Sequence, residues 1–241
     1  IVTGAYGGIG FASAKALAEQ GVMVTLVGRN RAKLEEAKEQ LSFGNVQAVT
    51  IDTENLKQLQ DFFYSTKKQD ILINSVGTNR PKSILEVSES DYDDVMNANS
   101  KSAFFQTQFF LQARKKDREE GWDNEVSIIH ISSQMGLVGG FERSIYCASK
   151  HFVEGFCKAV ALEIGEWNMR INTICPTFVQ TALTESTLKD KAKYDKVMSN
   201  IPMKRLAQTQ DIEGAIVYLA SSASSMVTGS AMRVDGGWCS Q

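Results

Sequence analysis

The sequence is poor in the residue types that mark metal sites and linkers. Its 241 residues include two histidines and four cysteines, and no pair of cysteines has CxxC spacing. A metal site is therefore not expected, and the thiols are expected to be reduced. With only three prolines, and without an internal repeat or a low-complexity tract, the chain is predicted to form one domain over residues 1–241.

An excess of one charge is also lacking. Lys and Arg number 26, Asp and Glu number 28, and the net charge of −2 is not typical of a protein with a nucleic-acid partner. The longest uncharged stretch, residues 214–232, contains five serines and is too polar for a membrane span. The opening on an apolar strand and a Gly-rich turn does not resemble a signal peptide, so a cytoplasmic location is expected.

Short apolar runs alternate with helical patterns along almost the whole chain. Strands are expected at 1–3, 22–27, 46–51, 71–76, 126–131, 169–175 and 231–234. Helices are expected at 9–20, after an Asn30 cap, after a Thr53 cap, from a Ser88 cap to about Arg118, at 146–166 and at 211–220. This alternation predicts an α/β fold with a doubly wound parallel sheet of the Rossmann type, in three αβα layers. The polar stretch from about 181 to 205 interrupts the pattern and is predicted to be a substrate lid.

A Gly-rich turn, TGAYGGIG at residues 3–10, joins the first strand to the first helix. Glycines at such a junction let the backbone turn sharply and approach a pyrophosphate, and the helix offers free N–H groups and its positive end. The position within a βαβ unit favours dinucleotide binding. Gly4, Gly8 and Gly10 fit one known spacing, whereas Gly4, Gly7 and Gly10 fit another.

The end of the second strand indicates which dinucleotide binds. Enzymes that prefer NAD usually place an acidic residue there, and an Arg accommodates the 2′-phosphate of NADP. This chain has Gly28, Arg29 and Asn30 and no acid. The planar Arg29 cation suits a phosphate, so NADP(H) is favoured and NAD(H) stays as the alternative.

Tyr146 and Lys150 are four residues apart and share one helical face, so the ammonium can lie near the phenol. A nearby cation favours phenolate and lowers the pKa of a tyrosine, which suits proton exchange with a carbonyl or alcohol oxygen. Ser133 follows the fifth strand and should reach the same crevice, because ligands of open parallel sheets bind beyond the carboxyl ends of the strands.

Four phenylalanines, Phe104, Phe105, Phe109 and Phe110, fall in the long helix. Adjacent pairs cannot all face one sheet, because neighbouring helical residues point about 100° apart. Either the helix is deeply buried, or its outer members pack against another copy of the chain; the second interpretation is favoured and predicts a homo-oligomer, a tetramer or a dimer.

Taken together, these motifs resemble those of the short-chain dehydrogenase/reductase family, over essentially the whole chain and in the family's order. The matching motifs are TGAYGGIG, Asn74 to Gly77 (NSVG), Asn99, Ser133, YCASK at 146–150 and VDGG at 234–237. The length and the VDGG segment match the compact, single-domain branch. The resemblance selects the Gly4, Gly8 and Gly10 spacing.

The resemblance implies a role for each matched residue. Tyr146 would be the general acid/base, Lys150 would lower its pKa and bond the nicotinamide ribose, Ser133 would orient the reacting oxygen, and Asn99 would hold a water of a proton relay. Asn99 could instead be a helix-kink residue. The implied cofactor-binding residues are Gly4, Tyr6, Gly8, Ile9, Gly10, Arg29, Asn30, Asp52, Thr53, Asn74, Gly77, Tyr146, Lys150, Pro176, Val179 and Thr181.

Three positions depart from the family pattern. Val76 replaces a smaller residue near the cofactor, and Thr177 replaces a glycine beside the nicotinamide and narrows the backbone there. Gly7 lies where NADP-preferring members often have a basic residue. None of the three removes a catalytic group.

These patterns predict reversible hydride transfer between NADP(H) and a ketone or 3-oxoacyl-type substrate with its secondary alcohol. The expected substrate-lining residues are Gln134, Met135, Phe141, Thr177 and Leu183, of which Met135 and Phe141 suggest a partly apolar pocket. The alternatives are an NAD-dependent polyol or sugar alcohol dehydrogenase and a non-catalytic nucleotide-sensing regulator. A Rossmann-like methyltransferase would not need the Tyr-Lys pair.

Overall fold

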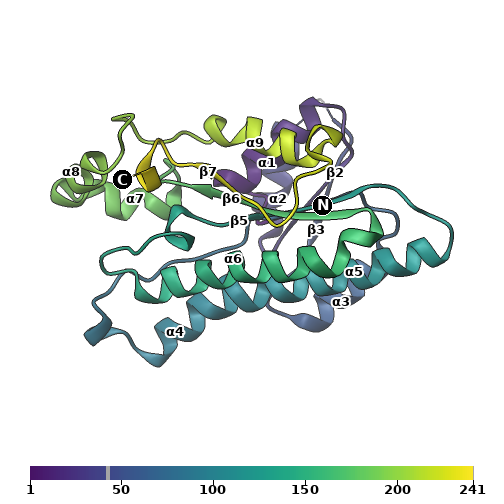
Figure 1. Cartoon of the computed structure of the whole chain (residues 1–241), viewed down its shortest axis with the longest axis horizontal. Helices are drawn as coiled ribbons and strands as arrows, with labels where there is room; N and C mark the ends of the chain where they lie inside the picture. The colour runs from purple at the N-terminus through teal and green to yellow at the C-terminus, as the bar shows by residue number, and fades with distance from the viewer. Residues whose placement is uncertain (42–43, 241) are drawn as a thin grey trace.

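The sheet organises the molecule. The computed structural model describes residues 1–41 and 44–240. Within them, seven parallel strands form one sheet in the order β3-β2-β1-β4-β5-β6-β7 (Figure 1). The strands are β1 (Val2–Thr3), β2 (Val24–Gly28), β3 (Val46–Thr50), β4 (Ile71–Asn74), β5 (Val126–Ile131), β6 (Met169–Pro176) and β7 (Ala231–Val234). The predicted doubly wound parallel sheet is confirmed.

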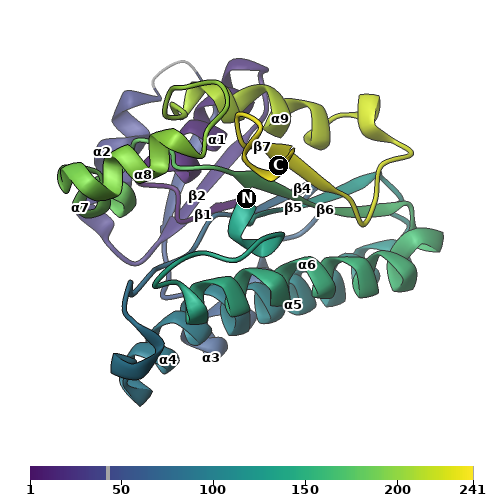
Figure 2. The same cartoon turned by 60° about the vertical axis from the view of Figure 1, so that its left-hand side comes forward.

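Helices cover both faces of the sheet (Figures 1 and 2). One layer contains α1 (Gly8–Glu19), α2 (Arg31–Gln40) and α9 (Gln210–Ala220). The other contains α3 (Leu56–Ser65), α4 (Glu89–Met96), α5 (Ser102–Glu119) and α6 (Ser144–Ile164). Each layer encloses its own apolar core against the fully buried middle strands. Among the described residues, no helix combines the length and the apolar character needed to cross a membrane.

The N-terminal cap of α3 differs from the prediction. The structure shows Asn55, not Thr53, at this position, with the Asn55 side chain accepting a hydrogen bond from the Gln58 backbone N–H at 3.2 Å. An N-cap oxygen serves the second or third helical N–H, and Thr53 lies too far upstream for that. Thr53 is instead buried at the edge of the sheet.

The long helix predicted after Ser88 contains an irregular segment in its middle. Ser88 and Asp91 form the expected capping box at the start of α4. Residues Asn97–Lys101 then form a π-helical segment before α5 begins. Such segments insert a bulge into a helix and often occur at functional sites. Asn99, one of the predicted site residues, lies in this segment.

The polar stretch predicted as a lid forms two short helices, and its role as a lid stays a prediction. They are α7 (Ala182–Lys189) and α8 (Lys191–Ser199), joined at Asp190, whose side chain caps α8. Both lie at one end of the molecule, beyond the strands (Figure 2). Val197, Ile201 and Leu206 form a small apolar cluster that fastens this segment to the rest of the chain.

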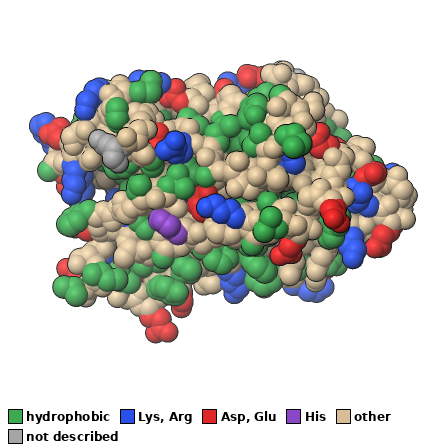
Figure 3. Space-filling view, viewed as in Figure 1, with side chains coloured by type: hydrophobic (Ala, Val, Ile, Leu, Met, Phe, Trp, Pro, Cys, Tyr) green, Lys and Arg blue, Asp and Glu red, His purple; other side chains and the backbone are tan. Residues whose placement is uncertain are grey.

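The phenylalanines of α5 divide between core and surface. Phe109 and Phe110 are buried, whereas Phe104 and Phe105 are half-buried, and the ring of Phe104 packs on that of Phe156 at 5.2 Å. Apolar side chains are scattered over the face that α6 presents (Figure 3). The homo-oligomer interface stays a prediction.

A buried ion pair lies within α5, and both of its members also form hydrogen bonds with the loop that precedes β4. Arg114 donates to the Thr66 carbonyl, and Asp117 accepts from the Lys68 backbone N–H. The guanidinium of Arg114 lies 3.0 Å from the Asp117 carboxylate, and both side chains are almost fully buried. Asp117→Asn should lower the free energy of unfolding by about 3–5 kcal/mol, because it leaves a buried cation without its counter-charge. Urea denaturation measures the loss.

The matched control for this pair is Asp61→Asn. Asp61 pairs with Lys57 at 3.1 Å, but both side chains are largely exposed. Exposed pairs contribute little to stability, so this variant should unfold near the wild-type urea concentration. Equal losses for the two variants would contradict the importance of burial at Asp117.

Candidate active site

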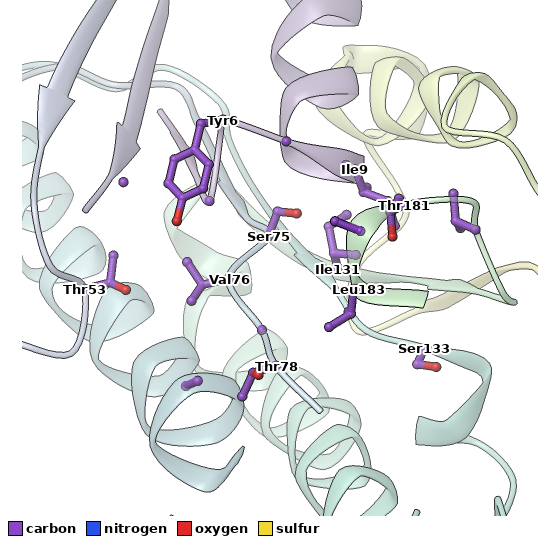
Figure 4. Close-up of a pocket in the computed structure, with 18 of the residues that line it drawn as sticks. Tyr6, Ile9, Thr53, Ser75, Val76, Thr78, Ile131, Ser133, Thr181 and Leu183 are labelled. Carbon is purple, nitrogen blue, oxygen red and sulfur yellow. The ribbon is translucent and has the colours of Figure 1, made fainter. Parts of the chain in front are cut away.

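A cavity of about 620 Å³ lies at the carboxyl edge of the sheet. Its lining comes from the segments after β1, β2, β3, β4, β5 and β6 and from the start of α7. The strand order reverses between β1 and β4, and open α/β sheets bind ligands in the crevice at such a point. Tyr6 and Thr53 lie at one end of the cavity, and Ser133, Thr181 and Leu183 lie toward the other (Figure 4).

The Gly-rich turn forms the wall of the cavity nearest α1. Gly4 and Gly8 have φ angles of +67° and +52°, a region that other residues rarely adopt. Gly7 is extended and has open space where a β-carbon would be. A β-carbon on Gly10 would lie 2.2 Å from the Gly4 carbonyl oxygen. The geometry therefore favours the Gly4, Gly8 and Gly10 spacing, with Gly10 acting through packing of α1 on the turn.

Two cations and an aromatic ring surround the end of the cavity beside β2. Arg29 and Lys33 both line it, and the Lys33 ammonium lies 5.9 Å from the centre of the Tyr6 ring. The Tyr6 ring in turn packs against Gly28, where a β-carbon would approach it to 2.7 Å. Sequence reasoning missed Lys33, although the basic residues of the 29–33 segment could have indicated it. Their positive charge suits a phosphate.

Ser133, Tyr146 and Lys150 converge on the opposite end of the same cavity. Ser133 follows β5, and Tyr146 and Lys150 share one face of α6. The Lys150 ammonium lies 5.8 Å from the centre of the Tyr146 ring and donates a hydrogen bond to the Ile131 carbonyl at 2.9 Å. The predicted juxtaposition of phenol, hydroxyl and ammonium is therefore present in the fold.

The pKa of Tyr146 differs from the expectation. Burial raises the pKa of Tyr146 to about 12, and its hydrogen bond with Ser133 opposes that rise. Burial also lowers the pKa of Lys150 to about 8. The predicted lowering of the Tyr146 pKa is thus not found in this structure, because desolvation of the phenol outweighs its hydrogen bond with Ser133 and the nearby charge of Arg143.

Asn99 connects the π-helical segment to the loop after β4. Its side-chain oxygen accepts from the Thr78 backbone N–H at 2.7 Å, and its amide donates to the Thr78 carbonyl and the Ser149 hydroxyl. A β-carbon on Gly77 would lie 3.3 Å from the Asn99 oxygen and 3.7 Å from the Lys150 nitrogen. Asn99 thus lies close to Lys150, and its role in a water relay stays a prediction.

Most of the predicted site residues line this one cavity. Those that do are Gly4, Tyr6, Gly8, Ile9, Arg29, Asp52, Thr53, Gly77, Ser133, Tyr146, Lys150, Pro176, Thr177, Val179, Thr181 and Leu183. Asn74 lies just beneath it, buried, with an amide nitrogen that has no partner in the described part of the chain. Gly10 and Asn99 lie behind the lining, and Asn30 is an exposed cap of α2.

Three of the five predicted substrate residues do not line the cavity. Gln134 and Met135 are buried in the turn after Ser133, and Phe141 is 75% exposed with the Lys196 ammonium 4.3 Å above its ring. Met135 and Phe141 therefore do not contribute to the lining, and the apolar part of the cavity comes from other residues, among them Ile131, Val179 and Leu183. Thr177 does line the cavity, and its buried hydroxyl lacks a partner among the described residues.

Two contacts join α7 and α8 to the loop before α6. Arg143 is buried and donates a hydrogen bond to the Thr187 hydroxyl of α7 at 3.3 Å. Lys193 of α8 lies 3.5 Å from Glu142. This segment therefore shares contacts with the residues that directly precede Tyr146. Over residues 1–41 and 44–240, no group of acids, histidines and cysteines is arranged to hold a metal ion.

Comparisons with known proteins agree with this arrangement. The Gly-rich turn after β1 and the crevice at the reversal of strand order are features of nucleotide-binding α/β proteins. A family model described as Enoyl-(Acyl carrier protein) reductase matches residues 4–239. The chain belongs to the short-chain dehydrogenase/reductase family of oxidoreductases.

Named relatives span two substrate types. The 3-oxoacyl-(acyl-carrier-protein) reductase of Chlamydia trachomatis is 34% identical over 98% of this chain and 95% of its own length. The 2-dehydro-3-deoxy-D-gluconate 5-dehydrogenase of Escherichia coli K12 is 35% identical over 99% of this chain and 94% of its own length.

One solved structure gives a close match to the whole fold. It is a proposed 2-deoxy-D-gluconate 3-dehydrogenase from Agrobacterium tumefaciens, with bound NADP. The TM-score is 0.92 at 33% identity, over 100% of this chain and 95% of the other.

The Gly10 contact leads to a direct test of the turn. Gly10→Ala should lower the free energy of unfolding by about 1–3 kcal/mol and weaken nucleotide binding, because the new methyl group would collide with the Gly4 carbonyl and move α1 away from the turn. Urea denaturation and a fluorescence titration with NADPH measure the two effects.

Gly7→Ala is the matched control, since Gly7 has an extended backbone and open space around it. Its unfolding midpoint should stay near that of the wild type. A Gly10→Ala protein as stable as the Gly7→Ala protein would contradict the close packing inferred for α1.

Proposed function

We propose that the protein transfers hydride reversibly between NADP(H) and a carbonyl or secondary alcohol substrate, with Tyr146 as general acid/base. The observation that supports this most strongly is the convergence of Ser133, Tyr146 and Lys150 on the cavity that the Gly-rich turn also lines. A nucleotide-sensing regulator would have no use for these three side chains together. The nicotinamide, when bound, supplies or accepts the hydride.

Tyr146, Ser133 and Lys150 each have a separate role in the proposed reaction. In the reducing direction, the Tyr146 phenol gives its proton to the substrate oxygen as that oxygen gains negative charge. The Ser133 hydroxyl donates a hydrogen bond to the same oxygen and stabilises the charge. A phenol with a pKa raised to about 12 is fully protonated at neutral pH, which suits a proton donor. The Lys150 ammonium stabilises the phenolate that is left.

The other end of the cavity has the features that NADP requires. Gly4 and Gly8 let the backbone approach a pyrophosphate, and the N-cap of α1 at Gly7 has no side chain to compete for the free N–H groups. Arg29 and Lys33 supply positive charge for a 2′-phosphate. The orphaned Asn74 amide nitrogen, just below the cavity, is a donor suited to the adenosine ribose.

The lining favours one of the two substrate types over the other. The lining contains Thr177, Thr181 and Thr184 as well as apolar residues such as Val179 and Leu183. The buried Thr177 hydroxyl has no partner among the described residues and can bond a hydroxylated substrate such as a sugar acid, whereas a 3-oxoacyl thioester has no comparable use for it. We therefore rank a sugar-acid or polyol substrate ahead of the acyl thioester expected from the sequence.

Location and assembly complete the proposal. The helix α5 has two half-buried phenylalanines, Phe104 and Phe105, on its outer side, which suit contact with a second copy of the chain. We therefore propose a homo-oligomer, either a tetramer or a dimer. The cytoplasmic location expected from the sequence is also part of the proposal.

Removal of one hydroxyl tests the proposed chemistry. Tyr146→Phe should reduce turnover by about 10²–10⁴-fold, because it removes the hydroxyl that donates the proton in the proposed reaction. NADPH oxidation is followed with 2-dehydro-3-deoxygluconate and with an acetoacetyl thioester, and NADPH binding is followed by fluorescence. Binding should stay near the wild-type level. Full activity in this variant would refute the proposed mechanism.

Cofactor choice has a separate test. Arg29→Ala should weaken NADPH binding by about 10- to 100-fold, since a hydrogen bond to a charged group contributes about 1.5–3 kcal/mol. NADH lacks the 2′-phosphate and should bind as before. Arg31→Ala is the control, because Arg31 is exposed on α2 and does not line the cavity. An equal loss for NADPH and NADH would contradict the phosphate role.

A further inference from the structure

A buried carboxylate lies directly behind the catalytic group. Glu154 is on α6, four residues after Lys150, and each of the two residues is only 5% exposed. Residues at this spacing in an α-helix have β-carbons about 5–6 Å apart on one face. The side chain points from α6 toward the sheet, because its partners come from β6. A buried acid is costly unless it is hydrogen-bonded and its charge is balanced.

Two donors on β6 hold the Glu154 carboxylate in place. The Thr173 hydroxyl donates to one oxygen at 2.9 Å, and the Cys175 thiol donates to the other at 3.2 Å. Thr173 and Cys175 are two residues apart and therefore face the same side of the sheet. Both carboxylate oxygens act as acceptors in these bonds, an arrangement that suits an anion.

The neighbours of this carboxylate leave few candidates for its counter-charge. From β5, the His130 ring has its pKa lowered to about 3 by burial and is neutral. From β6, burial raises the pKa of Cys175 to about 12, so its thiol is neutral too. On α6 itself, burial raises the pKa of Cys157 well above its usual value. Lys158 of α6 is exposed, and Arg170 of β6 already pairs with Glu125 at 2.8 Å. Among the described residues of these elements, Lys150 is therefore the buried cation without an acidic partner.

Lys150 is likewise a buried charged residue that needs an opposite charge nearby. Burial lowers the pKa of its ammonium, while negative charge at Cys175 or Glu154 opposes that effect. Because the Cys175 thiol is neutral at physiological pH, only Glu154 can supply this charge. Lys150 has the Ile131 carbonyl as a hydrogen-bond partner but has no ion-pair partner within 4 Å in the described residues. Lys150 and Glu154 are therefore buried residues of opposite formal charge on adjacent turns of α6.

The contacts around Gly136 bring the carboxylate side chain close to the catalytic loop as well. A β-carbon on Gly136 would lie 3.1 Å from Glu154 Cγ and 3.1 Å from the Lys150 carbonyl oxygen. Gly136 belongs to the turn that begins at Ser133. Glu154, Lys150 and the Ser133 turn thus form one packed unit.

We propose that Glu154 is the buried counter-charge of Lys150, a positioning residue that keeps the ammonium protonated for the reaction at Tyr146. This inference rests on the proposed function. Glu154 lies behind the cavity lining and does not touch the reacting atoms. It acts through Lys150: a protonated Lys150 stabilises the Tyr146 phenolate, and a neutral Lys150 would not.

The direct test is to titrate Lys150 itself, which needs no substrate. Protein containing lysine labelled with carbon-13 at Cε is titrated by NMR, and the Lys150 signal is assigned from its loss in Lys150→Arg. In Glu154→Gln the Lys150 pKa should fall by about one unit or more, the effect expected when a nearby opposite charge is removed. Glu163→Gln, an exposed change on the same helix, is the control and should leave the Lys150 pKa unchanged.

A second variant covers the case in which Glu154→Gln does not fold. Glu154→Leu combined with Thr173→Val removes the carboxylate and its hydroxyl donor together, and paired apolar replacement of this kind is nearly neutral for stability. The Lys150 pKa should fall in this protein as well. If the Lys150 pKa in the folded variant equals that of Glu163→Gln, the counter-charge role is refuted and Glu154 only ties α6 to β6.

The pH dependence of alcohol oxidation links this titration to catalysis. With less positive charge on Lys150, the Tyr146 phenolate is less stable, so the rise in rate with pH should move to higher pH in Glu154→Gln. Tyr146→Phe is measured beside it. Retained activity in Tyr146→Phe would refute the proposed function. Loss of activity there, with an unshifted profile in Glu154→Gln, would refute only the counter-charge.

Discussion

The approach of α1 to the turn after β1 is the constraint on which the nucleotide end of the cavity depends. Gly10 leaves no room for a β-carbon against the Gly4 carbonyl, and Gly4 itself packs on Ser75 after β4. The turn after β1, the start of α1 and the loop after β4 therefore contact one another through their main chains. Because that spacing is fixed by main-chain contacts, the free N–H groups of α1 face the cavity, whatever side chains the outer loops carry.

The catalytic end is organised on a different principle, by burial of charge along α6. Tyr146, Lys150 and Glu154 succeed one another at intervals of four residues, so one helix face carries a phenol, a cation and an anion. Desolvation raises the pKa of the phenol to about 12 and lowers that of the ammonium to about 8, so the two values move apart. In the proposed reaction the proton leaves the Tyr146 phenol, and the charges of Lys150 and Glu154 affect the stability of the phenolate that remains.

The sequence predicted the parts that depend on local pattern. The strands, the Ser88 capping box and the Tyr-Lys face of α6 depend on spacing alone, and each is present. The Thr53 cap was wrong because Asn55, two residues later, competes for the same role. Lys33 was missed because its place at the cavity depends on how α2 packs beside Tyr6, and no spacing rule contains that packing.

The pKa of Tyr146 illustrates why the remaining features could not be predicted. The Tyr-Lys spacing correctly indicated proximity, and proximity alone predicts a lowered pKa. The outcome depended on how much solvent the surrounding chain removes from the phenol, which is a property of the whole fold. The burial of Glu154 could not be predicted either, because an acid four residues after a lysine ordinarily forms an exposed helical pair with it. Only the two donors of β6 distinguish it, and they belong to a segment about twenty residues further along the chain.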